Sequence, residues 1–204
     1  MKIKCNLLLV AVATILLLSA CGTSPDADKD KADNTANGSA DTVGKVEVDE
    51  ATATDARENV MKDAKLTESD EQNYAISVLP DYTLTSEEPG KDSLMPIADE
   101  SVFMRIETMS KKDVTYDYLL ENMDAVLEAS SDGGTPVEVT DEASIPAGEG
   151  IENAKARSVK ADTATVTGII FERGDMIVRL TIYDTTKEEH FESFLRMGET
   201  IISK

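Results

Sequence analysis

Adjacent carboxylates are the residues of this chain that could most readily carry out chemistry without a cofactor. They occur at Glu87-Glu88, Asp99-Glu100 and Glu188-Glu189. Two carboxyl groups on either side of a glycosidic bond can hydrolyse it as a general acid and a nucleophile or base. However, 40 of the 204 residues are Asp or Glu, so adjacency carries little information, and the chain has no Trp to form a sugar platform. A carboxylate hydrolase is therefore the weakest of three functional hypotheses.

The other reactive residue types are scarce. His190 is the chain's one His and lies beside the apolar stripe of a predicted helix, which favours a rim histidine over a catalytic one. Two Cys and one His cannot build a structural zinc site. Asp26-x-Asp28-x-Asp30 resembles a calcium loop, but Lys31 and Asn37 occupy the positions that need Gly and Glu. We therefore expect no enzyme activity, no cofactor and no metal site.

The overall charge excludes one class of partner. Acidic residues outnumber Lys and Arg by 40 to 20, which gives a formal charge of −20. Phosphate backbones are bound by clusters of Lys and Arg, so nucleic acid is not an expected partner.

The N-terminal segment has the pattern of an export signal. Leu7–Leu18 is wholly apolar or small but reaches only about 18 Å as a helix, well short of a bilayer core of about 30 Å. Leu18-Ser19-Ala20-Cys21 then resembles the bacterial lipobox. The resemblance implies a signal peptide over 1–20, cleavage after Ala20, and a diacylglycerol thioether on Cys21 with further acylation, by palmitate or a similar chain, at the new amino terminus. The alternative is a plain secretory signal that happens to end near a cysteine.

These features predict a lipoprotein on the extracytoplasmic face of the cell membrane. Cys5 lies in the segment that would be removed, which leaves the lipid-blocked Cys21 as the only sulfhydryl position. Removal of Lys2 and Lys4 makes the chain still more acidic, and anionic headgroups repel such a surface. We therefore expect the acyl chains alone to hold the protein at the membrane.

The next segment, 21–72, is predicted to be an acidic, disordered tether. From 22 to 55 it has no aromatic residue, no Leu and no Ile, so it cannot bury enough apolar area to offset its ordering entropy. A flexible chain of about 50 residues reaches roughly 40 Å. Residues 56–70 contain helix formers with few apolar positions, which is compatible with a short or frayed helix.

The remaining segment, 73–204, reads as a single α+β domain. Alternation predicts a strand at 74–78 that returns through 82–85 as a hairpin, a second turn at 88–90, and a strand over 101–108. A period of three to four residues predicts a helix over 111–130. The rest of the pattern predicts a short strand near 137–139, a loop over 141–153, and strands over 156–159, 163–172 and 176–184, the last two joined at Arg173-Gly174-Asp175.

A terminal helix is expected to follow the last strand. Thr186-x-x-Glu189 has the pattern of a capping box that would open it. Its apolar face would comprise Phe191, Phe194, Leu195 and Ile202. Helices after and between antiparallel strands indicate an antiparallel sheet with helices packed on it.

The order of elements resembles the PsbP-like fold. The resemblance rests on the opening Tyr-x-Ile-x-Val-Leu-Pro-Asp-Tyr at 74–82, on the central helix and on the closing strand and helix, and it covers 74–203. It implies a PsbP-like α+β fold and a role in binding or assembling proteins, because members of this group are chiefly non-catalytic. It transfers no site residue. Together with the long tether it favours a Gram-positive host, where lipoproteins of this group occur.

Two aromatic residues are the candidate binding anchors. Phe103 lies on the outward side of a predicted strand, and Tyr118 follows Tyr116 so closely that both cannot face the core. The alternative is that they cover an edge of the core. The leading hypothesis is a lipid-anchored module that binds an unidentified envelope protein without catalysis. The second is a small-molecule or cation-binding accessory to a transporter, which the acidic surface would favour.

Overall fold

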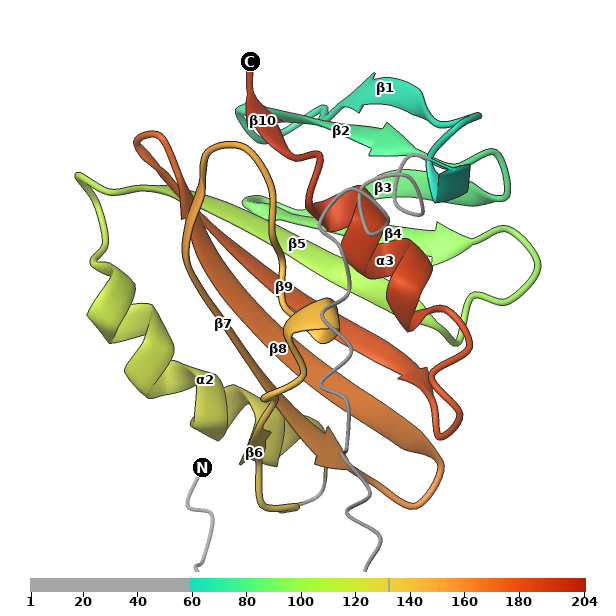
Figure 1. Cartoon of the computed structure of the whole chain (residues 1–204), viewed down its shortest axis with the longest axis vertical. Helices are drawn as coiled ribbons and strands as arrows, with labels where there is room; N and C mark the ends of the chain where they lie inside the picture. The colour runs from blue at the N-terminus through green and yellow to red at the C-terminus, as the bar shows by residue number, and fades with distance from the viewer. Residues whose placement is uncertain (1–58, 132) are drawn as a thin grey trace, which may run out of the picture. The chain divides into compact units, whose positions relative to one another are not determined.

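The computed structural model describes residues 59–131 and 133–204 (Figure 1). The predicted signal peptide, Cys21, the Asp26–Asp30 motif and most of the predicted tether lie outside these residues. The elements are, in chain order, β1 (Lys65–Glu68), β2 (Tyr74–Val78), β3 (Tyr82–Glu88), β4 (Lys91–Pro96), β5 (Phe103–Ser110), α2 (Tyr116–Ser130), β6 (Val137–Glu138), a 3₁₀ turn η1 (Glu142–Ser144), β7 (Ile151–Lys160), β8 (Ala164–Arg173), β9 (Met176–Thr185), α3 (Phe191–Gly198) and β10 (Ile202–Ser203).

The predicted α+β class is confirmed. Seven strands form one antiparallel sheet in the order β3-β4-β5-β9-β8-β7-β6, and β1, β2 and β10 form a small antiparallel sheet in the order β1-β2-β10. β8 and β9 form the predicted hairpin, in which Arg173 is opposite Met176. β9 then pairs with β5 from the earlier part of the chain, with Phe103 opposite Tyr183 and Ser110 opposite Met176.

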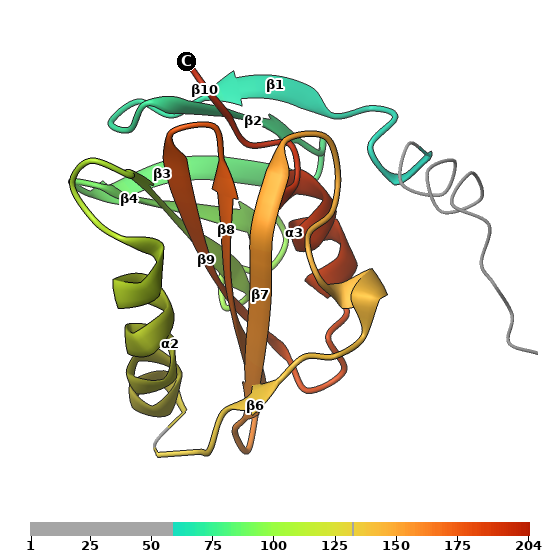
Figure 2. The same ribbon diagram turned by 60° about the vertical axis from the view of Figure 1, so that its left-hand side comes forward.

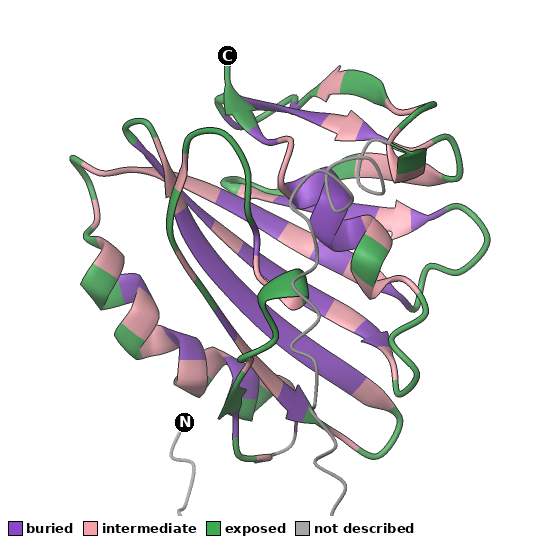
Figure 3. Ribbon diagram, viewed as in Figure 1, coloured by how far each residue is buried: buried purple, intermediate pink, exposed green. Residues whose placement is uncertain are grey.

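Each face of the large sheet is covered by a different element. In Figure 2, α2 lies on one side of β7, β8 and β9, and α3 lies on the other. The α3 face also carries the small sheet and holds the larger apolar cluster, whereas the α2 face holds the smaller one. The central strands are consequently buried along most of their length (Figure 3). The predicted inward face of β9 is confirmed at Met176, Val178, Leu180 and Ile182, but Ile177 is also buried, under α2.

The central helix forms as its period predicts, although it begins later. Thr115 is the N-cap, and its side chain accepts a hydrogen bond from the N–H of Tyr118. Leu119, Met123 and Leu127 are the buried stripe. The helix approaches β8 closely at Gly168, where a Cβ would lie 3.1 Å from Cγ of Met123, so a larger residue there would require the Met123 side chain to shift.

The predicted boundary between tether and domain is wrong, because the folded part begins before residue 73. Residues 65–68 form β1, which pairs with β2 in the register Lys65–Val78 to Glu68–Ala75. The short helix expected over 56–70 is therefore wrong from residue 65 onward. The segment has few apolar residues and is extended because β2 offers it backbone hydrogen bonds.

The expected hairpin over 74–85 is also wrong. β2 belongs to the small sheet and β3 to the large one, so Leu79–Asp81 is a crossover between sheets. β3 pairs instead with β4, through the predicted turn at 88–90. β4 has no clear alternation in the sequence, because two of its buried residues, Asp92 and Ser93, are polar. β7 begins at Ile151, within the segment predicted as a loop.

The C-terminal helix is present, but its predicted limits are wrong. His190 is the N-cap and its side chain makes no capping hydrogen bond. The carboxylate of Asp184 instead accepts the His190 N–H at 2.8 Å, in place of the predicted Thr186–Glu189 box. The helix ends at Gly198, and Ile202 lies in β10 with 45% of its surface exposed, while its neighbour Ile201 is buried.

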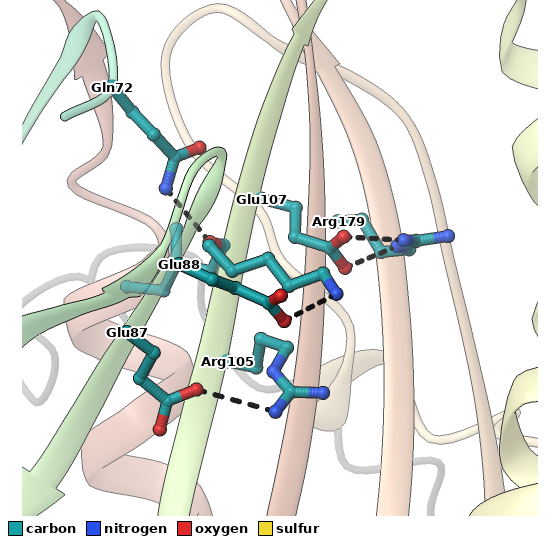
Figure 4. A network of polar contacts seen from close by, with 8 residues as sticks. Gln72, Glu87, Glu88, Arg105, Glu107 and Arg179 are labelled. Carbon is teal, nitrogen blue, oxygen red and sulfur yellow. Dashed lines mark hydrogen bonds and ion pairs between the residues drawn. The ribbon is translucent and has the colours of Figure 1, made fainter.

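A buried carboxylate joins the two sheets. Asp92 on β4 is fully buried, and its Oδ2 accepts hydrogen bonds from Tyr74 Oη at 2.7 Å and Gln72 Nε2 at 3.0 Å. Its Oδ1 accepts from Ser86 Oγ at 2.8 Å. Gln72 also donates to the Ile106 carbonyl of β5, and its amide appears at the top of the network in Figure 4. These bonds fix the small sheet over the β4–β5 part of the large one.

We predict that Tyr74→Phe lowers the free energy of unfolding by about 1–3 kcal/mol, because it leaves a buried carboxylate with one donor fewer. Urea unfolding followed by circular dichroism measures the change. Tyr118→Phe is the matched control, since that hydroxyl belongs to a side chain that is 58% exposed. Equal stability of the Tyr74→Phe variant and the wild type would contradict the assignment.

The same hydroxyl predicts a loss of stability at alkaline pH. Burial, with the hydrogen bond to Asp92 and its charge, raises the pKa of Tyr74 above the ordinary value of 10.0. The unfolded chain releases this proton near pH 10 while the folded chain keeps it, so stability is full below pH 10 and falls above it by up to about 1.4 kcal/mol per pH unit. This part of the loss should be missing in Tyr74→Phe.

Candidate functional site

A hollow of about 670 Å³ lies where β3 and β4 meet the start of α3. One wall is the crossover Leu79–Asp81 with Tyr82, and a second is Pro96 with the two residues after it, Ile97 and Ala98. The third wall comprises Glu189, His190 and Ser193, from the start of α3 and the residues just before it. Sites for small ligands and side chains usually enclose about 300–1,000 Å³.

An aromatic cluster forms the centre of this hollow. Tyr82 Oη lies 2.8 Å from His190 Nδ1. The Tyr82 ring meets the rings of His190 and Phe194 edge to face, with centroids 5.9 and 5.5 Å apart. Phe194 is fully buried, so the cluster is anchored in the core and only Tyr82 and His190 are partly open to the hollow. The cluster is therefore a rigid wall.

A second buried carboxylate positions His190. Asp184, at the end of β9, is 3% exposed and accepts hydrogen bonds from the backbone N–H groups of Thr185 at 2.6 Å and His190 at 2.8 Å. These bonds fold the segment between β9 and α3 back on itself. Both oxygens of the carboxylate are thereby engaged in holding the loop.

The hollow has a negative rim. Asp81 and Glu189 line it, and both are exposed. Asp99 is nearby, and hydrogen bonds from the hydroxyl and N–H of Ser101 hold the pKa of its carboxyl below the usual range, with a smaller contribution from His190. No Lys or Arg is among the lining residues.

This chemistry suits binding better than proton transfer. Burial raises the pKa of Tyr82, a hydrogen bond with Ser193 offsets part of this rise, and the charges of Asp184 and Asp81 add to it. Tyr82 therefore stays protonated at neutral pH and is a poor nucleophile. Its hydroxyl is in addition held by His190, so the pair acts as a fixed polar feature of the wall.

A second polar cluster lies on the large sheet and is structural (Figure 4). Arg179 on β9 donates two hydrogen bonds to Glu107 on β5, at 2.7 and 2.6 Å, and both side chains are more than four-fifths buried. Arg105 pairs with Glu87 at 3.3 Å in a more exposed position. Lys91 likewise pairs with Glu88 at 2.7 Å, so both carboxylates of the adjacent pair at 87–88 are occupied by cations.

The structure does not bring the two predicted anchors together. Phe103 is the first residue of β5 and stacks on Tyr183, with ring centroids 4.5 Å apart. Tyr118 lies beyond the other end of β5, near the start of α2, and is 58% exposed. The strand between them spans about 25 Å. Phe103 is thus engaged in packing, whereas Tyr118 remains a candidate contact.

Sequence reasoning missed the hollow. It placed His190 at the rim of a helix but did not pair it with Tyr82, which is distant in the sequence. The one available indication was that both walls contain a proline just after an apolar residue, at Leu79-Pro80 and Met95-Pro96. Such pairs favour extended backbone and the end of a strand.

Within 59–131 and 133–204, no group of three or more His, Cys, Asp or Glu side chains is arranged to hold a metal ion. None of the helices in these same ranges is both long and apolar enough to cross a bilayer.

Comparison with known proteins gives structural neighbours only. No protein-family model and no curated protein sequence matches the chain. The solution structure of cyanobacterial PsbP (CyanoP) from Synechocystis sp. PCC 6803 is similar, with 9% identity and a TM-score of 0.48 over 70% of this chain and 93% of that one. A crystal structure from Bacteroides thetaiotaomicron VPI-5482 has 11% identity and a TM-score of 0.42 over 70% of this chain.

Cyanobacterial PsbP is thus one of the solved structures that this chain is similar to. This chain spans about half, 49%, of the Bacteroides chain. We take no function from likenesses of this size, and the account of the site rests on the residues of this chain.

The Glu107–Arg179 pair should contribute more to stability than the Arg105–Glu87 pair. Arg179→Met leaves a buried carboxylate without its cation and should lower the free energy of unfolding by about 3 kcal/mol. Arg105→Met removes an exposed pair and should lower it by about 0.5 kcal/mol. Urea unfolding of both variants measures the difference.

The double variant Glu107→Gln with Arg179→Met provides the internal check. It should lose less stability than Arg179→Met alone, because no buried charge is left uncompensated. Equal losses of unfolding free energy in Arg179→Met and Arg105→Met would show that burial does not make the Glu107–Arg179 pair contribute more to stability than the Arg105–Glu87 pair.

Proposed function

We propose that this protein is a lipid-anchored extracytoplasmic lipoprotein that binds a protein partner at the cell envelope without catalysis, and that the Tyr82–His190 hollow is the contact site. The observation that carries the proposal is the combination of an exposed aliphatic residue, a rigid aromatic wall and an acidic rim in one hollow. Protein interfaces commonly have this anatomy, with an apolar anchor surrounded by polar groups that exclude water.

The exposed aliphatic residue is Ile97. It is 65% exposed although it follows a buried proline, Pro96, at the end of β4. Its backbone is fixed, since its N–H donates to the Asp81 carbonyl at 2.8 Å. Because the backbone at Ile97 is already ordered, a partner that covers this side chain does not have to order the main chain as well.

The proposed anchor is supported by the lipobox-like Leu18-Ser19-Ala20-Cys21 and by the charge of the chain. A strongly acidic body gains nothing from anionic headgroups, so attachment through acyl chains fits its composition. A tether between Cys21 and the folded part would let the hollow reach partners away from the membrane surface.

The second candidate function is an accessory that binds a small molecule or cation for a transporter. The volume of the hollow and its carboxylate rim favour this alternative. Calorimetry of the whole chain with divalent cations and common envelope metabolites separates the two, because the protein-binding proposal expects no saturable heat from either panel.

Cys21→Ser should release the protein from the membrane, because it removes the sulfur that would carry diacylglycerol. In cells fed radiolabelled palmitate, we expect label and membrane fractionation for the wild type and neither for the variant. The processed length of the two chains should also differ, since lipoprotein processing requires the lipidated cysteine. Identical fractionation with no label in either chain would refute the anchor.

A photo-crosslinking residue at position 97 should capture an envelope protein in intact cells. The matched control is the same residue at position 66, because Leu66 is 64% exposed and Ile97 is 65% exposed, but Leu66 lies on β1 outside the hollow. We expect an adduct of one defined mass from position 97 alone. Equal adducts from both positions, or none from position 97, would contradict the hollow as the contact site.

A further inference from the structure

The chemistry of the hollow also indicates what kind of partner segment it takes. This inference rests on the proposed function, since it names the chemistry recognised at the same site. The hollow is lined by two acidic residues, Asp81 and Glu189. The carboxylate of Asp99 is close enough to His190 for the two side chains to interact electrostatically. Lys187 lies two residues before Glu189 in an exposed loop and is not part of the lining.

The lining is also poor in hydrogen-bond donors. Pro80 and Pro96 have no N–H group to offer. The N–H groups of Tyr82, Ile97 and His190 are already donated to Leu79 O, Asp81 O and Asp184 Oδ2, respectively. Ser193 and the Tyr82–His190 pair are the other polar side chains of the lining, but its acidic groups, Asp81 and Glu189, face no Lys or Arg there. A ligand that supplies donors and positive charge complements these carboxylates.

The apolar part of the wall requires the ligand to have a second feature besides positive charge. Leu79, Pro80, Ile97 and Ala98 give aliphatic surface, and Tyr82 gives an aromatic edge. An isolated cation would leave this surface in water. A ligand with an aliphatic group beside its cation would cover this apolar surface and, at the same time, place its positive charge at the acidic rim.

We infer that the hollow receives an extended segment of the partner protein in which a lysine or arginine stands next to a leucine-like aliphatic residue. The aliphatic side chain packs on Ile97 and Pro80, and the cation lies between Asp81 and Glu189. A peptide fits better than a compact ion, because aliphatic residues and carboxylates line the same hollow of about 670 Å³.

The single histidine makes a direct test available. The probe is a capped hexapeptide of alternating leucine and lysine, and its counterpart has glutamate in place of lysine. Each is titrated into the detergent-solubilised whole chain while the ring C–H signals of the imidazole are followed by NMR, which reports His190 alone because the chain has no other His. We expect a saturable shift with the lysine peptide, none with the glutamate peptide, and weaker binding as salt is raised.

Neutralising the rim should weaken the lysine peptide about tenfold, in the double variant Asp81→Asn with Glu189→Gln. The control is Glu121→Gln with Glu128→Gln, which makes the same change in net charge on exposed positions of α2 and should leave the affinity unchanged. Ile97→Ser removes the aliphatic contact without adding charge, and it should abolish the saturable shift while circular dichroism shows the fold intact.

Three results would overturn the inference. They are an unsaturable shift, equal binding of the glutamate peptide, and an affinity that falls equally in the rim and α2 variants. Spermidine that binds as tightly as the peptide would also overturn it, in favour of a small cation. If position 97 still gives a specific adduct in cells while the lysine peptide fails to bind, the proposed function stands and only the assigned chemistry falls.

Discussion

The buried carboxylate of Asp92 imposes the constraint on which the rest of this structure depends. A charge removed from water must be met by donors, and here they come from Gln72, Tyr74 and Ser86. Two of these donors lie in or next to the small sheet, so satisfying the carboxylate docks that sheet on β4. Docking fixes the path of the chain between β2 and β3, and this crossover is one wall of the hollow. A stability requirement in the core thus determines the shape of the candidate site.

The sequence predicted the elements whose apolar residues follow a regular period. These are β5, α2 and the β8–β9 hairpin, where Leu119, Met123 and Leu127 or the alternate residues of β9 face the core. It failed where pairing partners decide the structure. β1 is polar, and it is a strand because its backbone pairs with β2. β4 lacks a recognisable apolar alternation, because one of its buried residues is the charged Asp92. The start of α3 was misplaced because the Asp184 carboxylate, in place of the predicted Thr186–Glu189 box, accepts the N–H of the N-cap His190.

The candidate site was harder to predict than the fold, for a related reason. Tyr82 and His190 approach only because β3 and α3 pack on the same core, and no local pattern couples them. Phe103 was selected because it alternates away from the core, but the partner strand supplies Tyr183 to cover it. The acidic composition also indicated no particular site, because the chain has 40 Asp and Glu residues. Asp81 and Glu189 become candidates for binding only because the fold places both in the lining of a hollow that also has apolar residues. The proposed binding role follows from that juxtaposition.

Carboxyl footprinting of the protein in its native envelope is the most direct test of the claim that the hollow is occupied by a partner. Carbodiimide labelling of intact envelopes and of the purified chain, followed by mass spectrometry, reports the access of reagent to each Asp and Glu. The account predicts that Asp81 and Glu189 are protected in the envelope and reactive after purification, while Glu121 on α2 labels equally in both. Equal labelling of all three carboxylates in the two preparations would contradict it.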